Sequence, residues 1–190
     1  MKKDEAAKVF EKSGALLKGH FILTSGRHSD KYMQCAQVLQ YPEYTEKLAK
    51  ELAKSFEKAG VELVVGPAMG GIIVSYEVAR QLGVQSIFCE RENGKMALRR
   101  GFSVKPGQKI LVVEDVITTG GSVKEVMDVV KAQGGVVVGV AVLVDRSSGS
   151  VDFGVKTVST LTLDVQSWPS DSCPLCKEGA QPPTKPGSRS

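Results

Sequence analysis

The stretch ILVVEDVITTGGS at positions 110–122 constrains the fold of this chain more than any other. It begins with an apolar run, continues with the adjacent carboxylates of Glu114 and Asp115, and ends in small residues before a helical pattern. This order predicts a buried strand, an acidic strand end, a tight turn and the start of a helix. Ligands of open parallel sheets bind beyond the carboxyl ends of the strands, so we expect a ligand site here.

The residue types in this stretch suit a sugar phosphate. Glycines and threonines at positions 118–122 let the backbone approach a ligand closely, so that N–H groups can point at a phosphate. The carboxylates of Glu114 and Asp115 would repel a phosphate, but they suit hydroxyl groups or a hydrated Mg²⁺ ion. The alternative is a tight turn without a ligand, and neither the G-x-x-x-x-G-K-[ST] loop nor the G-x-G-x-x-G spacing is present. The paired acids favour a binding site, because carboxylates at a buried strand end need a partner.

Positions 112–122, VVEDVITTGGS, resemble the phosphoribosyl-diphosphate (PRPP) signature of type I phosphoribosyltransferases, and the whole chain resembles the orotate-specific members of that family. The resemblance implies a glycosyltransferase (pentosyltransferase) that moves ribose 5-phosphate from PRPP to orotate. The products would be orotidine 5′-monophosphate and diphosphate, in de novo pyrimidine (UMP) biosynthesis. It also implies Mg²⁺ as cofactor, held mainly through PRPP and water and by no dedicated protein ligands. The implied PRPP-binding residues of the signature are Glu114, Asp115, Val116, Ile117, Thr118, Thr119, Gly120, Gly121 and Ser122.

Length and charge set the class of protein. A chain of 190 residues with 42% hydrophobic and 24% charged residues is typical of one globular domain. The net charge of +4 is mild and not gathered into a block, which fits an enzyme for anionic substrates at least as well as a nucleic-acid binder. The first residues lack the apolar core of a signal peptide, and no apolar run approaches membrane-spanning length. We therefore expect a cytoplasmic protein without membrane or nucleic-acid partners.

Helical and strand patterns alternate along the chain. We expect helices at residues 6–17, 42–59, 72–82 and 122–133, and strands at 21–23, 61–66, 84–89, 107–114, 136–144 and 155–163. Such alternation predicts an α/β fold, with an open, mainly parallel sheet flanked by helices and right-handed crossovers. Residues 1–190 would form a single domain, divided into an N-terminal hood (1–40), an α/β core (60–165) and an irregular tail (166–190).

A second glycine-rich loop, GPAMGG at positions 66–71, lies between a predicted strand and a predicted helix. It forms either a second anion cup or a tight packing of loop against sheet, and the residues alone favour neither. The resemblance implies that this loop holds the diphosphate of PRPP, through Ala68, Met69, Gly70 and Gly71.

Residues 90–101, called the lid segment here, are polar and carry four cations: Arg91, Lys95, Arg99 and Arg100. A solvated loop is one interpretation. The resemblance implies instead a mobile lid that closes over the active site of the neighbouring subunit in a homodimer. Many relatives carry a lysine where Glu92 stands, and a lid histidine is absent, so Arg99 and Arg100 are candidates to compensate. The implied catalytic residues are Arg91, Lys95, Glu114 and Asp115.

Arg146 follows the apolar strand predicted at residues 136–144. Its guanidinium can bind a planar carboxylate in bidentate fashion, or it can form an ion pair with the neighbouring Asp145. The resemblance implies that Arg146 binds the carboxylate of orotate, and that Tyr32 and Met33 of the hood cover its ring. Many relatives carry a lysine where Thr24 stands, so one expected pocket cation is missing. The implied orotate-binding residues are Arg27, Tyr32, Met33, Thr118 and Arg146.

The tail contains a Cys-x-x-Cys motif, Cys173 and Cys176, in a proline-rich segment. Such a motif can supply half of a zinc site. Cys35 and Cys89 lack suitable spacing for the other half, and the two histidines of the chain lie far away in the sequence. Completion across a dimer interface stays open, but the balance is against a metal role.

Two other functions share parts of this pattern. A purine or uracil phosphoribosyltransferase would carry the same PRPP signature, although the Ser-Gly-Arg segment ending at Arg27 and the presence of Arg146 argue against it. A PRPP-sensing regulator that binds nucleic acid would need a basic face or an added DNA-binding module. The residues before the core are too few for a helix-turn-helix module, so we expect no such partner, although RNA binding by a basic surface is harder to exclude.

Overall fold

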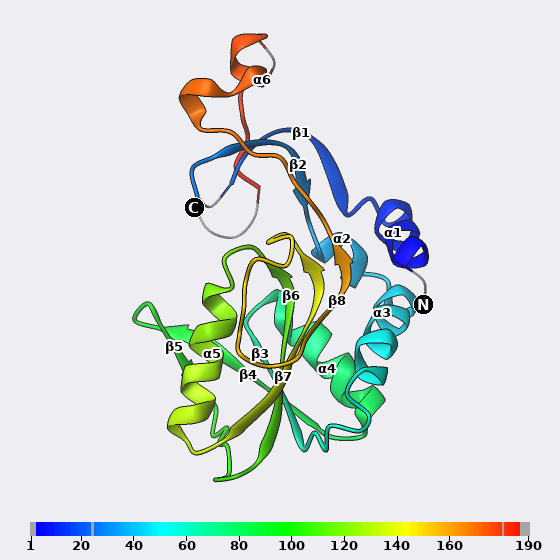
Figure 1. Ribbon diagram of the computed structural model, residues 1–190, viewed down its shortest axis with the longest axis vertical. Coiled ribbons are helices and arrows are strands. Elements are labelled where there is room, and N and C mark those ends of the chain that lie inside the picture. Colours follow the sequence, from blue (N-terminus) through cyan, green and yellow to red (C-terminus); the bar gives the residue numbers. More distant parts are fainter. Residues whose placement is uncertain (1–2, 24, 180, 187–190) are drawn as a thin grey trace.

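A six-stranded sheet forms the centre of the computed structural model, which describes residues 3–23, 25–179 and 181–186 (Figure 1). Its strand order is β5-β4-β3-β6-β7-β8, and every neighbouring pair is parallel except β4 and β5. The strands are β3 (Leu63–Pro67), β4 (Gln85–Glu92), β5 (Lys95–Leu98), β6 (Lys109–Ile117), β7 (Val136–Asp145) and β8 (Thr157–Thr162). The predicted α/β class with an open, mainly parallel sheet is confirmed.

Helices cover both faces of the sheet. Strand β6 shows this, since its successive residues point to opposite sides. Leu111 and Val113 belong to the apolar cluster under α3 (Pro42–Lys54) and α4 (Gly70–Leu82). Ile110 and Val112 belong to the cluster under α5 (Gly121–Ala132). Strand β6 is therefore buried on both sides, as its continuous apolar run predicted. None of the described helices is long and apolar enough to cross a membrane.

The hood folds differently from the prediction in two places. Helix α1 (Lys3–Lys12) ends early, and Leu16 and Leu17, expected at its end, begin strand β1 (Leu16–Ile22). Residues 28–33, which were not among the predicted strands, form strand β2 (His28–Met33), which pairs antiparallel with β1. A short helix, α2 (Ala36–Leu39), then leads to α3. The helix prediction was wrong here because two leucines fit a strand face as well as a helix face.

The tail lies along the hood, beyond the carboxyl edge of the sheet (Figure 1). It includes a 3₁₀ turn, η1 (Ser170–Ser172), and a short helix, α6 (Pro174–Lys177), so it is less irregular than predicted. Trp168 exchanges two backbone hydrogen bonds with His28 at 2.8 and 2.9 Å, and Thr184 bonds to the backbone of His20 and Ile22 at 2.9 and 2.7 Å. The tail therefore borders both edges of the β1–β2 hairpin and places the two histidines beside the Cys-x-x-Cys motif.

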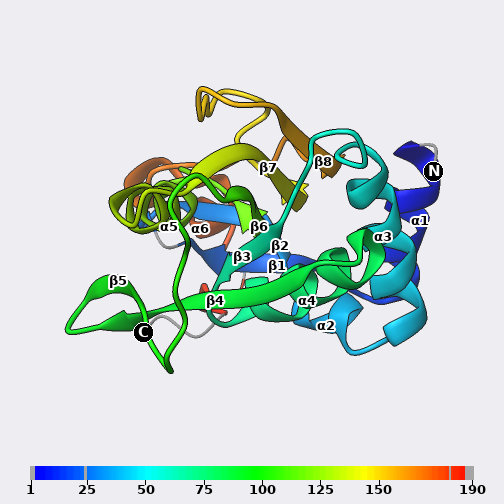
Figure 2. The same cartoon turned by 90° about the horizontal axis from the view of Figure 1, so that it is seen from below.

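The lid segment is a β-hairpin and not the loop that was predicted. Strands β4 and β5 pair antiparallel around a turn at Asn93 and Gly94, both with positive φ angles of 51° and 79°. Asn-Gly in this conformation is a favoured two-residue hairpin turn. Figure 2 shows the hairpin projecting from the body of the molecule.

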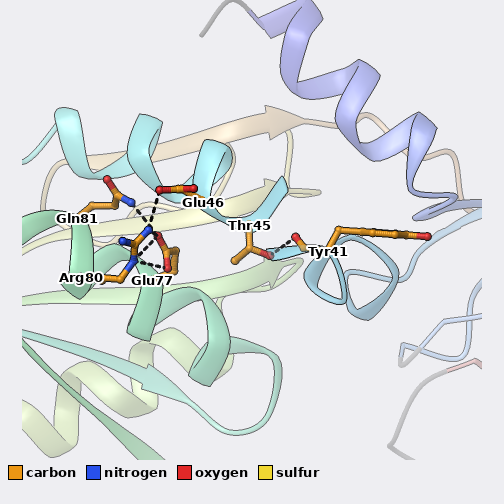
Figure 3. A network of polar contacts seen from close by, with 6 residues as sticks. All are labelled: Tyr41, Thr45, Glu46, Glu77, Arg80 and Gln81. Atoms are coloured by element: carbon orange, nitrogen blue, oxygen red, sulfur yellow. Dashed lines mark hydrogen bonds and ion pairs between the residues drawn. The ribbon is translucent and has the colours of Figure 1, made fainter. Parts of the chain in front are cut away.

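Helices α3 and α4 are joined by polar contacts at the surface (Figure 3). Arg80 of α4 bonds to Glu46 of α3 at 2.8 Å and to Glu77 on its own helix at 2.7 Å, and Gln81 donates to Glu77 at 2.7 Å. Burial raises the pKa of Glu77, but the hydrogen bonds from Arg80 and Gln81 outweigh it and hold that pKa below its ordinary value. These contacts hold α4, whose first turn borders the site, against α3.

Because β6 is buried on both faces, a cavity made in this strand should lower the free energy of unfolding. Leu111→Ala should lower the free energy of unfolding by about 2–5 kcal/mol, because Leu111 is 0% exposed and its removed atoms leave a cavity. Denaturant unfolding followed by circular dichroism measures this loss. Val136→Ala on the neighbouring strand is the matched control, since Val136 is 49% exposed and should cost far less. Equal losses in both variants would contradict the assigned packing of β6.

Candidate active site

A cavity of about 1280 Å³ opens beyond the carboxyl ends of the strands, between the core and the hood. The end of β6 and the turn into α5 form one wall, and the hood and the tail form others. The predicted site residues that line it are Tyr32, Met33, Ala68, Met69, Gly70, Arg91, Glu114, Asp115, Val116, Ile117, Thr118, Thr119, Gly120, Gly121, Ser122 and Arg146. Arg27, Gly71 and Lys95 are the predicted site residues that do not line it.

The carboxylates of Glu114 and Asp115 stand at the end of β6, as predicted. An oxygen of Glu114 accepts a hydrogen bond from the backbone of Asp115 at 3.0 Å, and an oxygen of Asp115 accepts one from Val116 at 2.8 Å. Glu114 is buried, whereas Asp115 is half-buried at the cavity wall. Each carboxylate is thus oriented by the backbone, and both residues line the cavity.

The turn that follows leads into α5, at the position where an anion cup was predicted. Gly120 caps α5 with φ of 73°, and a side chain there would meet Phe153 at 2.9 Å, so glycine is required on both counts. Within the described chain, the backbone N–H groups of residues 118–121 have no internal acceptor. Unpaired N–H groups at a helix start bind anions well, because the helix dipole adds to the hydrogen bonds.

The second glycine-rich loop lies directly against the acidic strand end. A Cβ atom on Gly70 would lie 2.1 Å from an Asp115 carboxylate oxygen, and one on Gly71 would lie 3.2 Å from an oxygen of Glu114. The peptide bond between Ala68 and Met69 is cis. The two loops therefore form one continuous surface. The sequence alone indicated two separate glycine-rich loops and did not show that they adjoin.

Of the lid cations, Arg91 alone lines the cavity, within the described residues. Its guanidinium bonds to the Gly94 carbonyl at 2.6 Å and forms an ion pair with Glu125 of α5 at 2.9 Å. The other two arginines, Arg99 and Arg100, form ion pairs with glutamates of β4 at 3.2 and 3.0 Å. The structure thus places Arg91 at the site, whereas the lid roles of Lys95, Arg99 and Arg100 stay predictions.

Arg146 is a half-buried cation that lines the cavity. Burial lowers its pKa, and its Nε atom has no hydrogen-bond partner among the described residues. Asp145 does not pair with it, because that carboxylate accepts bonds from Ser147 and from the backbone of Gly149. The alternative of an Arg146–Asp145 ion pair is therefore wrong, and a half-buried guanidinium with a buried Nε atom that lacks a partner indicates a site for an anion.

The hood brings Tyr32 and Met33 to the same end of the cavity. The guanidinium carbon of Arg146 lies 6.0 Å from the centre of the Tyr32 ring. Burial raises the pKa of Tyr32, while the positive charge of Arg146 opposes that shift. Arg27 instead bonds to Ser167 of the tail, through Nε at 2.9 Å and through a second contact to the Ser167 carbonyl. Arg27 therefore joins hood to tail, and a direct role in binding is not supported by its position.

Several cavity residues were missed. Cys35 lines the wall beneath Asp115, and Glu125 faces Arg91. Ser167 and Lys185 reach the cavity from the tail, which no local pattern indicated. The signal that could have placed the tail there was the Cys-x-x-Cys motif taken together with the two hood histidines.

An acidic strand end, a cup of free N–H groups and an adjoining glycine loop are the features of a phosphoribosyltransferase. Residues 35–175 match the family described as phosphoribosyl transferase domain. The chain is 64% identical to the orotate phosphoribosyltransferase of Desulforamulus reducens over 189 residues, covering 100% of this chain and 98% of that protein. It is 58% identical to that of Thermotoga maritima over 181 residues, covering 95% and 96%. The chain belongs to the orotate phosphoribosyltransferase family.

Solved structures agree with this assignment. The crystal structure of orotate phosphoribosyltransferase from Aeropyrum pernix matches with a TM-score of 0.68 and 31% identity, over 83% of this chain and 93% of that one. Adenine phosphoribosyltransferase from Thermoanaerobacter pseudethanolicus matches with a TM-score of 0.60 and 22% identity, over 70% and 88%. The second likeness concerns the fold alone.

The buried thiols of the cavity and sheet should react slowly with iodoacetamide at pH 8. Burial raises the pKa of Cys35 well above its ordinary value, and the Asp115 and Glu114 carboxylates raise it further. Burial raises the pKa of Cys89 to about 12. A raised pKa leaves little thiolate, which is the reactive form. Peptide mass spectrometry of briefly labelled native protein, with denatured protein as control, measures this, and rapid labelling of Cys35 in folded protein would refute it.

Proposed function

We propose that this protein transfers ribose 5-phosphate from PRPP to orotate, giving orotidine 5′-monophosphate and diphosphate for pyrimidine (UMP) biosynthesis. The observation that carries the proposal is the half-buried guanidinium of Arg146, whose buried Nε atom has no hydrogen-bond partner among the described residues, in the same cavity as the acidic strand end and the turn into α5. Orotate is a planar base with a carboxylate, and such a guanidinium can bind that carboxylate through two parallel hydrogen bonds. We place the reaction in the cytosol, because a polyanionic sugar phosphate does not cross a lipid bilayer.

The donor sugar fits the wall formed by β6 and α5. The hydroxyl groups of the ribose donate to the carboxylates of Glu114 and Asp115, which the backbone already orients. The 5′-phosphate accepts from the free N–H groups of residues 118–121, with the exposed hydroxyls of Thr118 and Thr119 nearby. This division puts the negative phosphate at the helix start and keeps it away from the two acids.

The leaving diphosphate fits the loop that contains Gly70 and the guanidinium of Arg91. The backbone of this loop approaches Asp115 so closely that the diphosphate and the ribose hydroxyls would be neighbours. Arg91 must leave Glu125 to reach the diphosphate. Closure of the hairpin formed by β4 and β5 would bring that change about, and the same motion would exclude water.

The donor atoms of this cavity fit Mg²⁺ bound largely through substrate. Mg²⁺ prefers oxygen ligands and commonly binds one or two carboxylates together with substrate phosphates and water. Glu114 and Asp115 are the carboxylates beside the sugar, and the diphosphate would supply the remaining charge. When bound, the ion would neutralise the departing diphosphate.

The chemistry breaks the bond between ribose C1′ and the diphosphate oxygen and forms a bond from C1′ to N1 of orotate. The proton of N1 leaves to the departing diphosphate or to water. Positive charge develops on the sugar as the diphosphate leaves, and the carboxylates of Glu114 and Asp115 stabilise it. Arg146 and Tyr32 hold the base with N1 toward C1′, so that two bound partners react without a diffusional step. No side chain of the cavity is assigned as an obligatory base.

A homodimer is part of the proposal. Helix α4 and the loop before it expose three large apolar side chains in one row: Met69 is 77% exposed, Ile73 48% and Tyr76 65%. This spacing of i, i+4 and i+7 forms an apolar stripe on a helix. Met69 and Ile73 also line the cavity, so a second copy on this face would border the site and could present its lid segment, residues 90–101. Light scattering of the purified protein tests this association.

The reaction is tested by mixing the protein with orotate, PRPP and Mg²⁺ and following the loss of orotate absorbance. Addition of diphosphate to the products should reverse the change. Rapid, Mg²⁺-dependent conversion supports the proposal. Conversion of uracil or adenine in place of orotate would reject the base assignment while retaining the sugar-phosphate site.

Replacement of the strand-end acid should affect turnover and not folding. Asp115→Asn should lower kcat by about 10²-fold, the order lost when one transition-state contact is removed, because the amide cannot balance the charge on the sugar. The unfolding midpoint should change little, since the amide oxygen can still accept from Val116. Asp128→Asn on the exposed face of α5 is the matched control and should retain full activity. Undiminished kcat in the first variant would remove Asp115 from the mechanism.

Removal of the half-buried cation should weaken orotate binding alone. Arg146→Ala should raise KM for orotate by about 10–10²-fold, since hydrogen bonds to a charged group contribute about 1.5–3 kcal/mol. KM for PRPP should stay near that of the unaltered protein, and stability should change little, because Arg146 forms no ion pair among the described residues and loses only its contact with the Tyr32 ring. Lys58→Ala, at an exposed position outside the cavity lining, is the control. Equal losses of both affinities would contradict the assigned role.

A further inference from the structure

A second site lies between hood and tail, where four potential metal ligands converge. The ring nitrogens of His20 and His28 and the thiols of Cys173 and Cys176 all lie within 4.8 Å of one another. We propose that these four side chains bind one structural Zn²⁺ ion, which fastens the tail to the hood. The sequence placed the histidines far from the cysteines, and the fold brings them together across 153 residues.

The distances suit tetrahedral coordination. Zinc bonds of about 2.0–2.1 Å to nitrogen and about 2.3 Å to sulfur place neighbouring ligand atoms roughly 3.3–3.8 Å apart. The sulfur of Cys173 lies 3.5 Å from Nε2 of His20, and the sulfur of Cys176 lies 3.7 Å from that atom and 3.4 Å from Nδ1 of His28. The two ring nitrogens are 2.9 Å apart and would separate by a few tenths of an ångström.

The surroundings of His20 support this assignment. Its other ring nitrogen, Nδ1, lies 2.9 Å from the carbonyl oxygen of Gln181. A hydrogen bond from Nδ1 to that carbonyl leaves Nε2 without a proton and directed at the thiols. Histidines that bind metals commonly donate their other N–H group to a backbone carbonyl in this way. Gln181 belongs to the tail, so the tail supplies two ligands and also orients a third.

The donor set selects the metal. Two thiolates and two imidazoles in tetrahedral arrangement are typical of Zn²⁺, whereas Mg²⁺ and Ca²⁺ prefer oxygen. Four protein ligands leave no open position for water or substrate, which characterises structural and not catalytic zinc. His20, His28 and Cys173 are buried, so the ion would be shielded from solvent on most sides. Within the described residues, the carboxylates of the active site do not contribute to this cluster.

The tail needs such an anchor. It is rich in proline, and its cysteine motif lies in a helix of only four residues, so little apolar surface holds it in place. It nevertheless carries Ser167 and Lys185 to the wall of the active-site cavity. Backbone pairing with His20 and His28 brings the tail to the same two residues that would bind the ion. The zinc ion would therefore stabilise one wall of the base pocket from outside it.

Metal analysis of the purified full-length protein tests the proposal without reference to activity. Protein produced with zinc in the medium should contain one zinc ion per chain by inductively coupled plasma mass spectrometry. Apoprotein reloaded with Co²⁺ should show the visible bands of tetrahedral cobalt and a thiolate charge-transfer band. Failure of the apoprotein to bind Zn²⁺ or Co²⁺ would overturn the proposal. A disulfide between Cys173 and Cys176 in freshly isolated protein, found by thiol counting, would overturn it also.

Paired variants locate the ion. Cys173→Ser combined with Cys176→Ser should lose the zinc, and His20→Gln should lower the zinc affinity at least tenfold. Cys89→Ala, which removes a thiol of the sheet, should keep one zinc ion per chain. Retention of zinc by the double cysteine variant would reject these ligands. If the double variant does not fold, the cobalt spectrum of the reloaded native protein still decides, because it reports thiolate ligands directly.

Two further measurements test the structural role. Removal of zinc by a chelator should make trypsin cleave after Lys177 at least tenfold faster, while cleavage within the core stays slow. On the proposed function, removal of zinc should also raise KM for orotate by a larger factor than KM for PRPP, each relative to the zinc-loaded protein. Unchanged tail cleavage after complete removal of zinc would reject the anchoring role even if the metal is bound.

Discussion

The pairing of β6 between β3 and β7 is the contact on which the rest of the molecule depends. This strand is buried on both faces, and its two neighbours hold it in parallel register. Its last residues therefore emerge from the sheet at one defined point, with Glu114 and Asp115 oriented by backbone hydrogen bonds. Helix α5 begins immediately afterwards, so the acids and the anion cup are positioned by the same buried strand.

Around this strand, the core, the hood, the tail and the lid segment each contribute residues to the cavity. The core contributes the sugar-phosphate wall through short connections between strands and helices. On the proposed function, the hood and the tail would form the base pocket. Arg91 of the lid segment, whose strands β4 and β5 belong to the sheet, would bind the diphosphate. A division of this kind lets the catalytic groups stay in place while the covering elements admit the substrates and release the products.

The core and the signature were predictable from the sequence because their information is local. An apolar run flanked by glycines indicates a buried strand, and the residues from Glu114 to Ser122 carry their chemistry in one continuous stretch. The boundaries of α1 were wrong because Leu16 and Leu17 suit either a helix or a strand. The contribution of the tail could not be predicted, because contacts such as Trp168 with His28 depend on the folded arrangement of distant segments. The cavity role of Lys185 was missed for the same reason.

In the cavity, the carboxylate of Glu125 competes with any incoming anion for the guanidinium of Arg91. Before a substrate enters, the guanidinium that would meet the diphosphate is already satisfied by a carboxylate of the protein. An incoming anion must therefore displace Glu125 from Arg91. The electrostatic part of its binding free energy is the difference between its own attraction to Arg91 and that of Glu125. A singly charged anion such as chloride gains little from that exchange, whereas a metal-bound diphosphate offers several oxygens at once. On the proposed function, the exchange would favour polyvalent ligands by a small margin only, because an ion pair whose side chains are 40% and 42% exposed contributes about 0–1 kcal/mol.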